Sequence, residues 1–66
     1  MTLQVNGQPQ ALPEPATLEG LVDALDLTGK RLAIEHNGQI IPRSVWAQTA
    51  VADDDRIEIV KAIGGG

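Results

Sequence analysis

One segment of the chain, residues 17–29, carries the apolar spacing of an α-helix, and this helix constrains the rest of the fold. Its apolar residues recur at i, i+3, i+4 and i+7 and are Leu18, Leu21, Val22 and Leu25. Thr17 suits the N-cap, and Gly29, followed by two basic residues, is expected to end the helix. Because a single helix must bury its apolar face against a sheet, we predict an α+β fold.

Two Asn-Gly pairs predict two β-hairpins, one on each side of the helix. Asn6-Gly7 and Asn37-Gly38 each follow a stretch of alternating apolar and polar residues. Pro9 and Pro13 cannot donate backbone hydrogen bonds, so the second arm of the first hairpin should be an edge strand. The second hairpin is expected to end at Pro42.

The remaining segments complete a mixed sheet. Residues 44–55 are too few for a long helix, and residues 44–48 within them are expected to form a short turn that places Trp46 against the core. "RIEIVKAI", residues 56–63, reads as the last strand. We expect a mixed sheet of four to five strands packed on one helix, with residues 1–63 as one domain and residues 64–66 as a flexible glycine tail.

Composition excludes several classes of protein. The chain has 66 residues and no cysteine, so it has neither disulfides nor thiolate metal sites. A net charge of −4 with five scattered basic residues argues against nucleic acid as a partner. The N-terminus lacks the pattern of a signal peptide, and no apolar run approaches the roughly 18 residues of a membrane span. We therefore expect a cytoplasmic protein that does not contact membranes.

A search for catalytic side chains finds little. His36 has no evident partner and is interpreted as an ordinary hairpin residue. Ser44 is expected to cap the short turn rather than act as a nucleophile. Asp53–Asp55 is interpreted as a tight turn rather than a metal site, with Asp54 in the left-handed region. Trp46 is expected to pack in the core rather than to serve as an exposed anchor for a partner.

The glycines at the end of the chain, Gly64–Gly66, follow the predicted last strand without a spacer. A terminal carboxylate has a pKa near 3.5, so it is ionised at neutral pH and resists nucleophiles until it is converted to an activated acyl group. Adenylation by ATP is the obvious route. Glycines suit such a substrate because, lacking a Cβ, they can pass through a narrow channel. The alternative is a disordered end with no role.

The segments "NGQIIPRSVWAQTAV" and "DDDRIEIVKAIGGG" resemble the ThiS family of thiamin sulfur carriers, which has the ubiquitin-like β-grasp fold. The resemblance spans the whole chain. It implies that Gly66 is adenylated by an E1-like (ThiF-like) adenylyltransferase using MgATP and becomes a thiocarboxylate with sulfur from a persulfide donor. It also implies that Gly64 and Gly65 thread into partner active sites, and that a ThiG-like thiazole synthase receives the sulfur. Such a carrier is not an enzyme and binds no cofactor of its own.

Two other functions share the same tail. One is a sulfur carrier for molybdopterin or for a sulfur amino acid, which would use the same chemistry with a different acceptor. The other is a ubiquitin-like modifier, whose terminal glycine forms isopeptide bonds. An independent enzyme is the least supported class, because the sequence offers no catalytic base, nucleophile or metal cluster.

Overall fold

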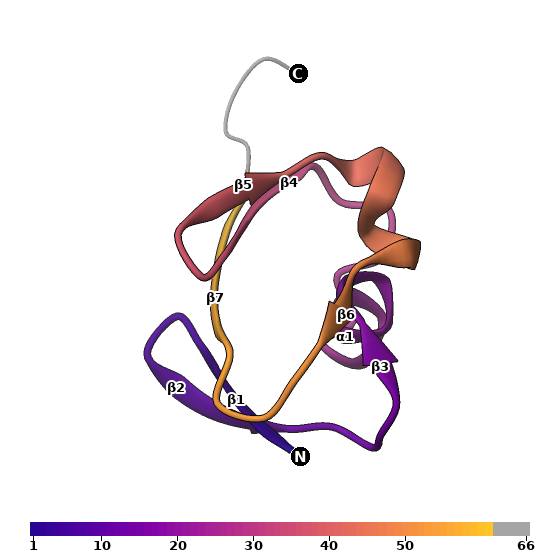
Figure 1. The fold of residues 1–66 in the computed structure, drawn as a ribbon. Coiled ribbons are helices and arrows are strands. Elements are labelled where there is room, and N and C mark those ends of the chain that lie inside the picture. The colour runs from indigo at the N-terminus through magenta and orange to yellow at the C-terminus, as the bar shows by residue number, and fades with distance from the viewer. Residues whose placement is uncertain (62–66) are drawn as a thin grey trace.

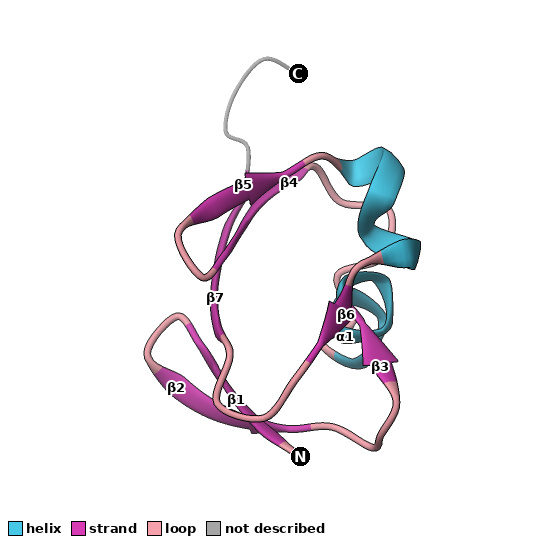
Figure 2. Cartoon of the chain, in the orientation of Figure 1, coloured by secondary structure: helices cyan, strands magenta, loops and turns pink. Residues whose placement is uncertain are grey.

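A computed structural model describes residues 1–61, and the predictions for Ala62 to Gly66 lie outside this range. Within this range the chain forms one α-helix, one 3₁₀ helix and seven strands, which lie around a single core (Figures 1 and 2). In chain order the elements are β1 (Thr2–Val5), β2 (Gln8–Ala11), β3 (Ala16–Thr17), α1 (Leu18–Ala24), β4 (Leu32–His36), β5 (Gln39–Ile41), η1 (Arg43–Gln48), β6 (Ala50–Val51) and β7 (Arg56–Lys61).

The main sheet has five strands in the order β2-β1-β7-β4-β5, and the last strand in sequence, β7, lies in the middle. Strands β1 and β7 are parallel, whereas the other neighbours are antiparallel. The predicted mixed sheet on one helix is therefore confirmed. Pro9 lies in β2, which is an edge strand as expected.

Both Asn-Gly pairs form the predicted hairpin turns. Asn6 and Gly7 have φ of 51° and 80°, and Asn37 and Gly38 have φ of 51° and 89°. Positive φ at both central residues matches the right-handed twist of the flanking strands, which is why this dipeptide is favoured there. Each hairpin therefore takes its register from its turn.

Helix α1 begins where the sequence predicts and ends earlier. Thr17 caps it, since its Oγ1 accepts a hydrogen bond from the Gly20 backbone N–H at 3.1 Å. The prediction that Gly29 ends the helix is wrong, because Asp26 takes the left-handed conformation with φ of 59°. The backbone N–H of Leu27 then donates to the carbonyl of Val22 at 3.0 Å, which closes a Schellman motif.

The core lies between α1 and one face of the main sheet. Its fully buried side chains come from both layers and are Leu3, Leu18, Leu21, Ile34 and Ile57. Trp46, on η1, is 4% exposed, and its Nε1–H donates to the Ile41 carbonyl at 2.8 Å. The prediction that a short turn places Trp46 in the core is confirmed, and its apolar body and polar tip are both accommodated.

Two local features differ from the sequence interpretation. Ser44 does not cap η1, because this helix begins at Arg43 and its N-cap, Pro42, makes no side-chain capping bond. The two-residue strands β3 and β6 form a small separate sheet, with Ala16 opposite Val51 and Thr17 opposite Ala50. Strands this short carry no readable alternation, so the sequence does not predict them.

Candidate functional site

Strand β7 is the element that leads to the terminal glycines, and its two sides differ. Ile57 and Ile59 point into the core, with exposures of 0% and 9%. Arg56, Glu58 and Val60 alternate with them and are exposed. The period of two that defines a strand thus gives β7 one side for folding and one side open to solvent.

Backbone pairing fixes β7 along both edges. Strand β4 pairs with it at five positions, from Leu32 opposite Lys61 to His36 opposite Ile57. Strand β1 pairs at only two positions before the chain turns away at Asn6. The Asn6 side chain continues the ladder, because its Oδ1 accepts from the Ile59 N–H at 2.7 Å and its Nδ2 donates to the Ile59 carbonyl at 3.1 Å.

A second asparagine holds the start of β7. Asn37 Oδ1 accepts from the Arg56 N–H at 2.8 Å, and its Nδ2 donates to Asp55 at 3.1 Å. Asp55 also lies 2.7 Å from His36 Nε2 and accepts from the Ala52 N–H at 2.8 Å. The turn before β7 is thereby joined to the β4–β5 hairpin.

The hydrogen bonds around Asp55 change the pKa of its carboxyl group. Burial would raise its pKa, but the hydrogen bonds from His36, Ala52 and Asn37, together with the charge of His36, outweigh burial, so the pKa lies below its ordinary value. His36 therefore has a partner that sequence reasoning missed. The two residues are 19 positions apart, and no local spacing connects them.

The acidic triplet forms the turn that the sequence predicts. Asp54 has φ of 69°, in the left-handed region, as expected. Asp53 Oδ1 accepts from the Thr2 N–H at 2.7 Å, so this carboxylate holds the first strand.

Within residues 1–61, no group of three potential ligand side chains could hold a metal ion. No helix in the same range is long and apolar enough to cross a bilayer.

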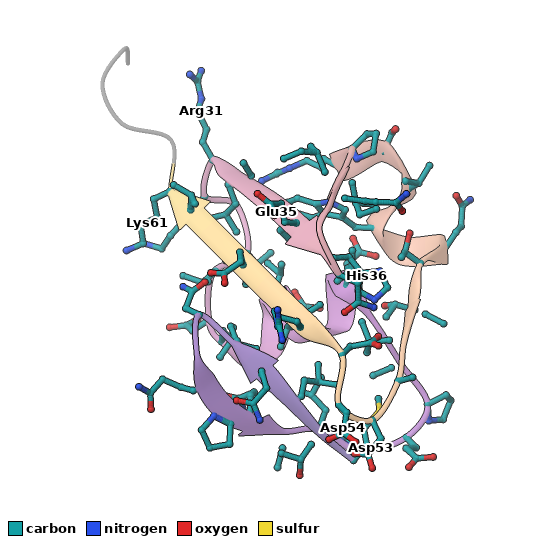
Figure 3. All side chains as sticks on the ribbon, turned by 60° about the vertical axis from the view of Figure 1, so that its left-hand side comes forward. Arg31, Glu35, His36, Asp53, Asp54 and Lys61 are labelled. Carbon is teal, nitrogen blue, oxygen red and sulfur yellow. The ribbon has the colours of Figure 1, made fainter. Side chains whose placement is uncertain are left out.

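The predicted site residues Gly64, Gly65 and Gly66 lie outside the described residues, which end at Lys61. Lys61 and Arg31 lie at one end of the main sheet, and Asp53 and Asp54 lie at the other (Figure 3). Gly66 lies five positions after Lys61, and five extended residues span about 17 Å. The middle strand of the sheet therefore directs the chain toward the end that carries Lys61.

Comparison with known proteins decides the family. Residues 3–66 match the sequence profile described as "ThiS family". The chain belongs to the ThiS family. ThiS proteins are sulfur carriers and not enzymes.

Individual ThiS relatives agree along the full length. The sulfur carrier protein ThiS of Escherichia coli is 35% identical over 66 residues, which cover 100% of both chains. The crystal structure of the ThiS protein of Geobacter metallireducens superposes with a TM-score of 0.85 at 32% identity, again over 100% of both chains. The predicted β-grasp fold is therefore confirmed.

A third relative is a larger protein. The thiazole synthase of Paramagnetospirillum magneticum is 41% identical over 66 residues, which are 100% of this chain and 20% of that protein. The chain thus spans about one fifth of the length of this relative. A ThiS-like sequence is there part of the same polypeptide as an enzyme named for thiazole synthesis.

Proposed function

We propose that this ThiS family protein carries sulfur for thiazole formation in thiamin biosynthesis, with the carboxyl group of Gly66 as the reacting group. The family match, which extends to residue 66, supports Gly66 as the acceptor. The thiazole synthase that contains a 41% identical segment supports the pathway and favours it over molybdopterin or protein modification.

The proposed chemistry begins with activation of the carboxylate. An oxygen of the Gly66 carboxylate attacks the α-phosphorus of MgATP in an E1-like (ThiF-like) enzyme, and pyrophosphate leaves. The outer sulfur of a persulfide then attacks the acyl carbon and displaces AMP. The product is an acyl disulfide, which keeps the S–S bond of the persulfide. A thiol then attacks the inner sulfur of that bond and forms a disulfide with it, and the thiocarboxylate leaves. The thiocarboxylate donates its sulfur to a ThiG-like thiazole synthase. MgATP is bound by the activating enzyme, and the carrier needs no cofactor.

Each part of the chain has a role in this proposal. Residues 1–63 form the folded domain that partners recognise, and Gly64 and Gly65 enter the narrow active sites. Glycine lacks a Cβ, so an enzyme can close around the backbone. Ordering a flexible segment costs about 1–2 kcal/mol per residue, and contacts between the folded domain and the partner must offset this cost. We expect the reaction to take place in the cytoplasm, where ATP is available.

Intact mass measurement tests the proposal. The wild-type chain is incubated with MgATP and an E1-like adenylyltransferase, and then with a persulfide donor and a thiol. We expect the mass of a terminal adenylate, followed by the mass gain of sulfur replacing one oxygen. A wild-type chain that stays unmodified with an enzyme active on another ThiS protein would overturn the proposal.

Two variants locate the reacting group. Deletion of Gly66 should abolish the sulfur gain and leave the thermal unfolding midpoint unchanged, since residues 1–61 contain the whole described core. Gln10→Ala is the matched control, because Gln10 lies on the edge strand β2 and should be modified like wild type. Sulfur on the chain that lacks Gly66 would exclude Gly66 as the acceptor.

A further inference from the structure

A mostly apolar hollow lies beside helix α1, and no residue of β7 lines it. It has a volume of about 540 Å³ and lies between α1 and the chain that leads from β2 into β3. Its lining includes Leu12, Pro13, Pro15 and Ala16 from that chain and Gly20 and Asp23 from α1. We call this surface the helix hollow.

Gly20 lines the helix hollow, although the fold does not require glycine at this position. Its φ is not positive, unlike that of Gly7, Gly29 and Gly38. Apart from its own helix, a Cβ on Gly20 would meet only Thr17 Oγ1, at an ordinary contact distance of 3.6 Å. Glycine also favours a helix less than alanine does. What the missing side chain provides is room in the helix hollow.

The charged side chains beside the helix hollow are acidic. Asp23 lines it, and the Thr28 hydroxyl donates to the Asp23 Oδ1 and so holds this carboxylate in place. Glu14 is exposed and lies between the two lining prolines in the sequence. Within residues 1–61 neither carboxylate belongs to an ion pair. A suitable occupant therefore combines an apolar side chain with a positive charge.

The segment that follows β7 has this chemistry. Lys61, exposed at the end of β7, is followed in the sequence by Ala62, Ile63 and the terminal glycines. In an extended chain, side chains two positions apart point to the same side and lie about 7 Å from each other. Lys61 and Ile63 can therefore present a positive charge and a branched apolar side chain to one surface.

A chain cannot place this segment in its own helix hollow. Leu12 pairs with the first residue of the chain, and Gln4, three positions later, lies opposite Arg56 on the parallel strand β7. Lys61 is five positions further along β7, so Leu12 and Lys61 are eight positions, or about 26 Å, apart along the sheet. In Figure 1, β1 accordingly begins at one end of the molecule and β7 ends near the other. Ile63 reaches only about 7 Å beyond Lys61, so the occupant must come from a second copy.

We infer that the chain forms a weak reciprocal dimer in which Lys61 and Ile63 of each copy bind the helix hollow of the other. Ile63 contacts the apolar wall, and Lys61 lies beside Asp23. Because the helix hollow and the end of β7 are at opposite ends of the molecule, two antiparallel copies can exchange both segments at once, which closes the assembly at two copies.

The dimer has a consequence for the C-terminus. Ile63 precedes Gly66 by three positions, so a copy whose Ile63 is bound by its partner cannot place Gly66 deep in an enzyme at the same time. The dimer is then a reserve form of the carrier that dissociates on dilution. This consequence rests on the proposed function, whereas the dimer itself does not.

Sedimentation equilibrium of the full chain tests the dimer. We expect a dissociation constant of about 0.1–1 mM, since contacts this small bind weakly. Ile63→Ser should raise that constant about tenfold or more, because it removes a buried apolar side chain from each contact. Ile40→Ser is the matched control, since Ile40 is 67% exposed on β5 and outside the helix hollow, and it should dimerise like wild type. A wild-type chain that stays monomeric at about 3 mM overturns the inference.

Filling the helix hollow should affect folding and dimerisation differently. Leucine favours a helix more than glycine does, so Gly20→Leu should unfold at or above the wild-type midpoint, while its dimer should be about tenfold weaker or more. If the leucine lowers the midpoint, Gly20→Ala makes the same comparison with a single methyl group. Ala47→Leu, exposed on η1 and outside the helix hollow, is the control and should dimerise like wild type. Undiminished dimerisation of a folded Gly20 variant would exclude the helix hollow.

Exchange of charges tests the contact between Lys61 and Asp23. Asp23→Lys and Lys61→Asp move the net charge of −4 in opposite directions, so a general effect of net charge cannot weaken the dimer in both. We expect each change alone to raise the dissociation constant. Their combination should restore it to near the wild-type value, because the same pair then forms with its charges exchanged. A double variant as weak as the single ones would exclude this placement of the segment.

NMR of an equal mixture of isotope-labelled and unlabelled chains identifies the occupant. We expect intermolecular NOEs from the Ile63 methyl groups to Leu12 and Ala16. Intermolecular NOEs at Ile40 and Val60 instead would show a dimer through the other side of the main sheet and would overturn the inference. None of these measurements uses an activating enzyme, so their failure leaves the proposed function intact. A chain that dimerises as described but is not adenylated by a competent enzyme would contradict that function alone.

Discussion

The two sides of β7 differ sharply, although they belong to the same six residues. On the inner side, Ile57 and Ile59 are buried and hold the sheet to helix α1. On the outer side, Glu58 and Val60 are exposed, and Glu58 opposes another glutamate. Nothing in the folding of the free chain requires an exposed valine beside a pair of like charges. Folding therefore uses every second residue of this strand and leaves the alternate residues open to solvent.

This division suits a small carrier. A chain of 66 residues has too little core to lose any of it, so any contact with another protein has to use positions that do not stabilise the fold. Alternation along the middle strand of the sheet supplies such positions. The following predictions test the division, from the largest expected change in stability to the smallest.

Ile57→Ala on the inner side should have the largest effect. Removing a fully buried isoleucine side chain typically costs about 2–5 kcal/mol of unfolding free energy. A single core of this size supplies only about 3–5 kcal/mol, so the variant should be largely unfolded at 37 °C. Val60→Ala, three residues later on the outer side, should change stability by less than about 0.5 kcal/mol. Urea denaturation of both variants measures the two losses of unfolding free energy. Equal losses would refute the difference between the two sides of β7.

Asn6→Gly tests the edge of β7 that β1 leaves unpaired. Glycine keeps the positive φ of the turn but removes both hydrogen bonds to the Ile59 backbone. We expect a loss of about 1–3 kcal/mol in unfolding free energy, because a part-buried N–H and carbonyl lose their partner. Gln8→Ala, on the neighbouring edge strand, serves as control. Amide hydrogen exchange at Ile59 should accelerate only in Asn6→Gly.

Asp55→Asn tests the network at the start of β7. The pKa of Asp55 lies below its ordinary value in the folded chain, so its ionised form stabilises the fold above the unfolded pKa, and this stabilisation is lost as pH falls through the folded pKa. At pH 7 the variant should be less stable than wild type by about 1–2 kcal/mol. The difference in unfolding free energy between the variant and wild type should become smaller below about pH 4. A difference in unfolding free energy that stays constant down to pH 2 would show that the charge of Asp55 does not stabilise the fold.

Glu58→Gln should have the smallest effect and the opposite sign. Removing one of two opposed carboxylates should stabilise the free carrier by roughly 0.2–1 kcal/mol at low salt. Glu35→Gln should give a similar gain, and the two gains should not add, because either change relieves the same repulsion. Thermal unfolding at two salt concentrations measures this. A loss of stability in either variant would show that the pair is not repulsive.

Much of this fold follows from local sequence signals. Asn6-Gly7 and Asn37-Gly38 require positive φ and therefore predict both hairpins, and Pro9 predicts the sheet edge. The helix end was harder to predict, because Asp26 takes the left-handed conformation that Gly29, three positions later, would adopt more readily. Serine is a residue type that often caps helices, but Ser44 lies inside η1 rather than before its first residue.

The parts of the site that sequence could not give depend on contacts between distant strands. His36 and Asp55 meet because β4 pairs with β7 in one register, and that register also places Glu35 opposite Glu58. Alternation within β7 identifies Val60 as outward, but only the sheet order places Ile40 on the same surface. The proposed role of Gly66 rests instead on the resemblance to the ThiS family along the whole chain.

The central claim is that the Gly66 carboxyl group is the reacting group, and its most direct test changes that group alone. Two synthetic chains, one ending in the Gly66 carboxylate and one in the Gly66 carboxamide, are compared in ATP–pyrophosphate exchange with the E1-like enzyme. Both should fold identically, because they differ only in the terminal group. The account predicts exchange with the carboxylate and none above background with the carboxamide. Equal exchange with both chains would contradict it.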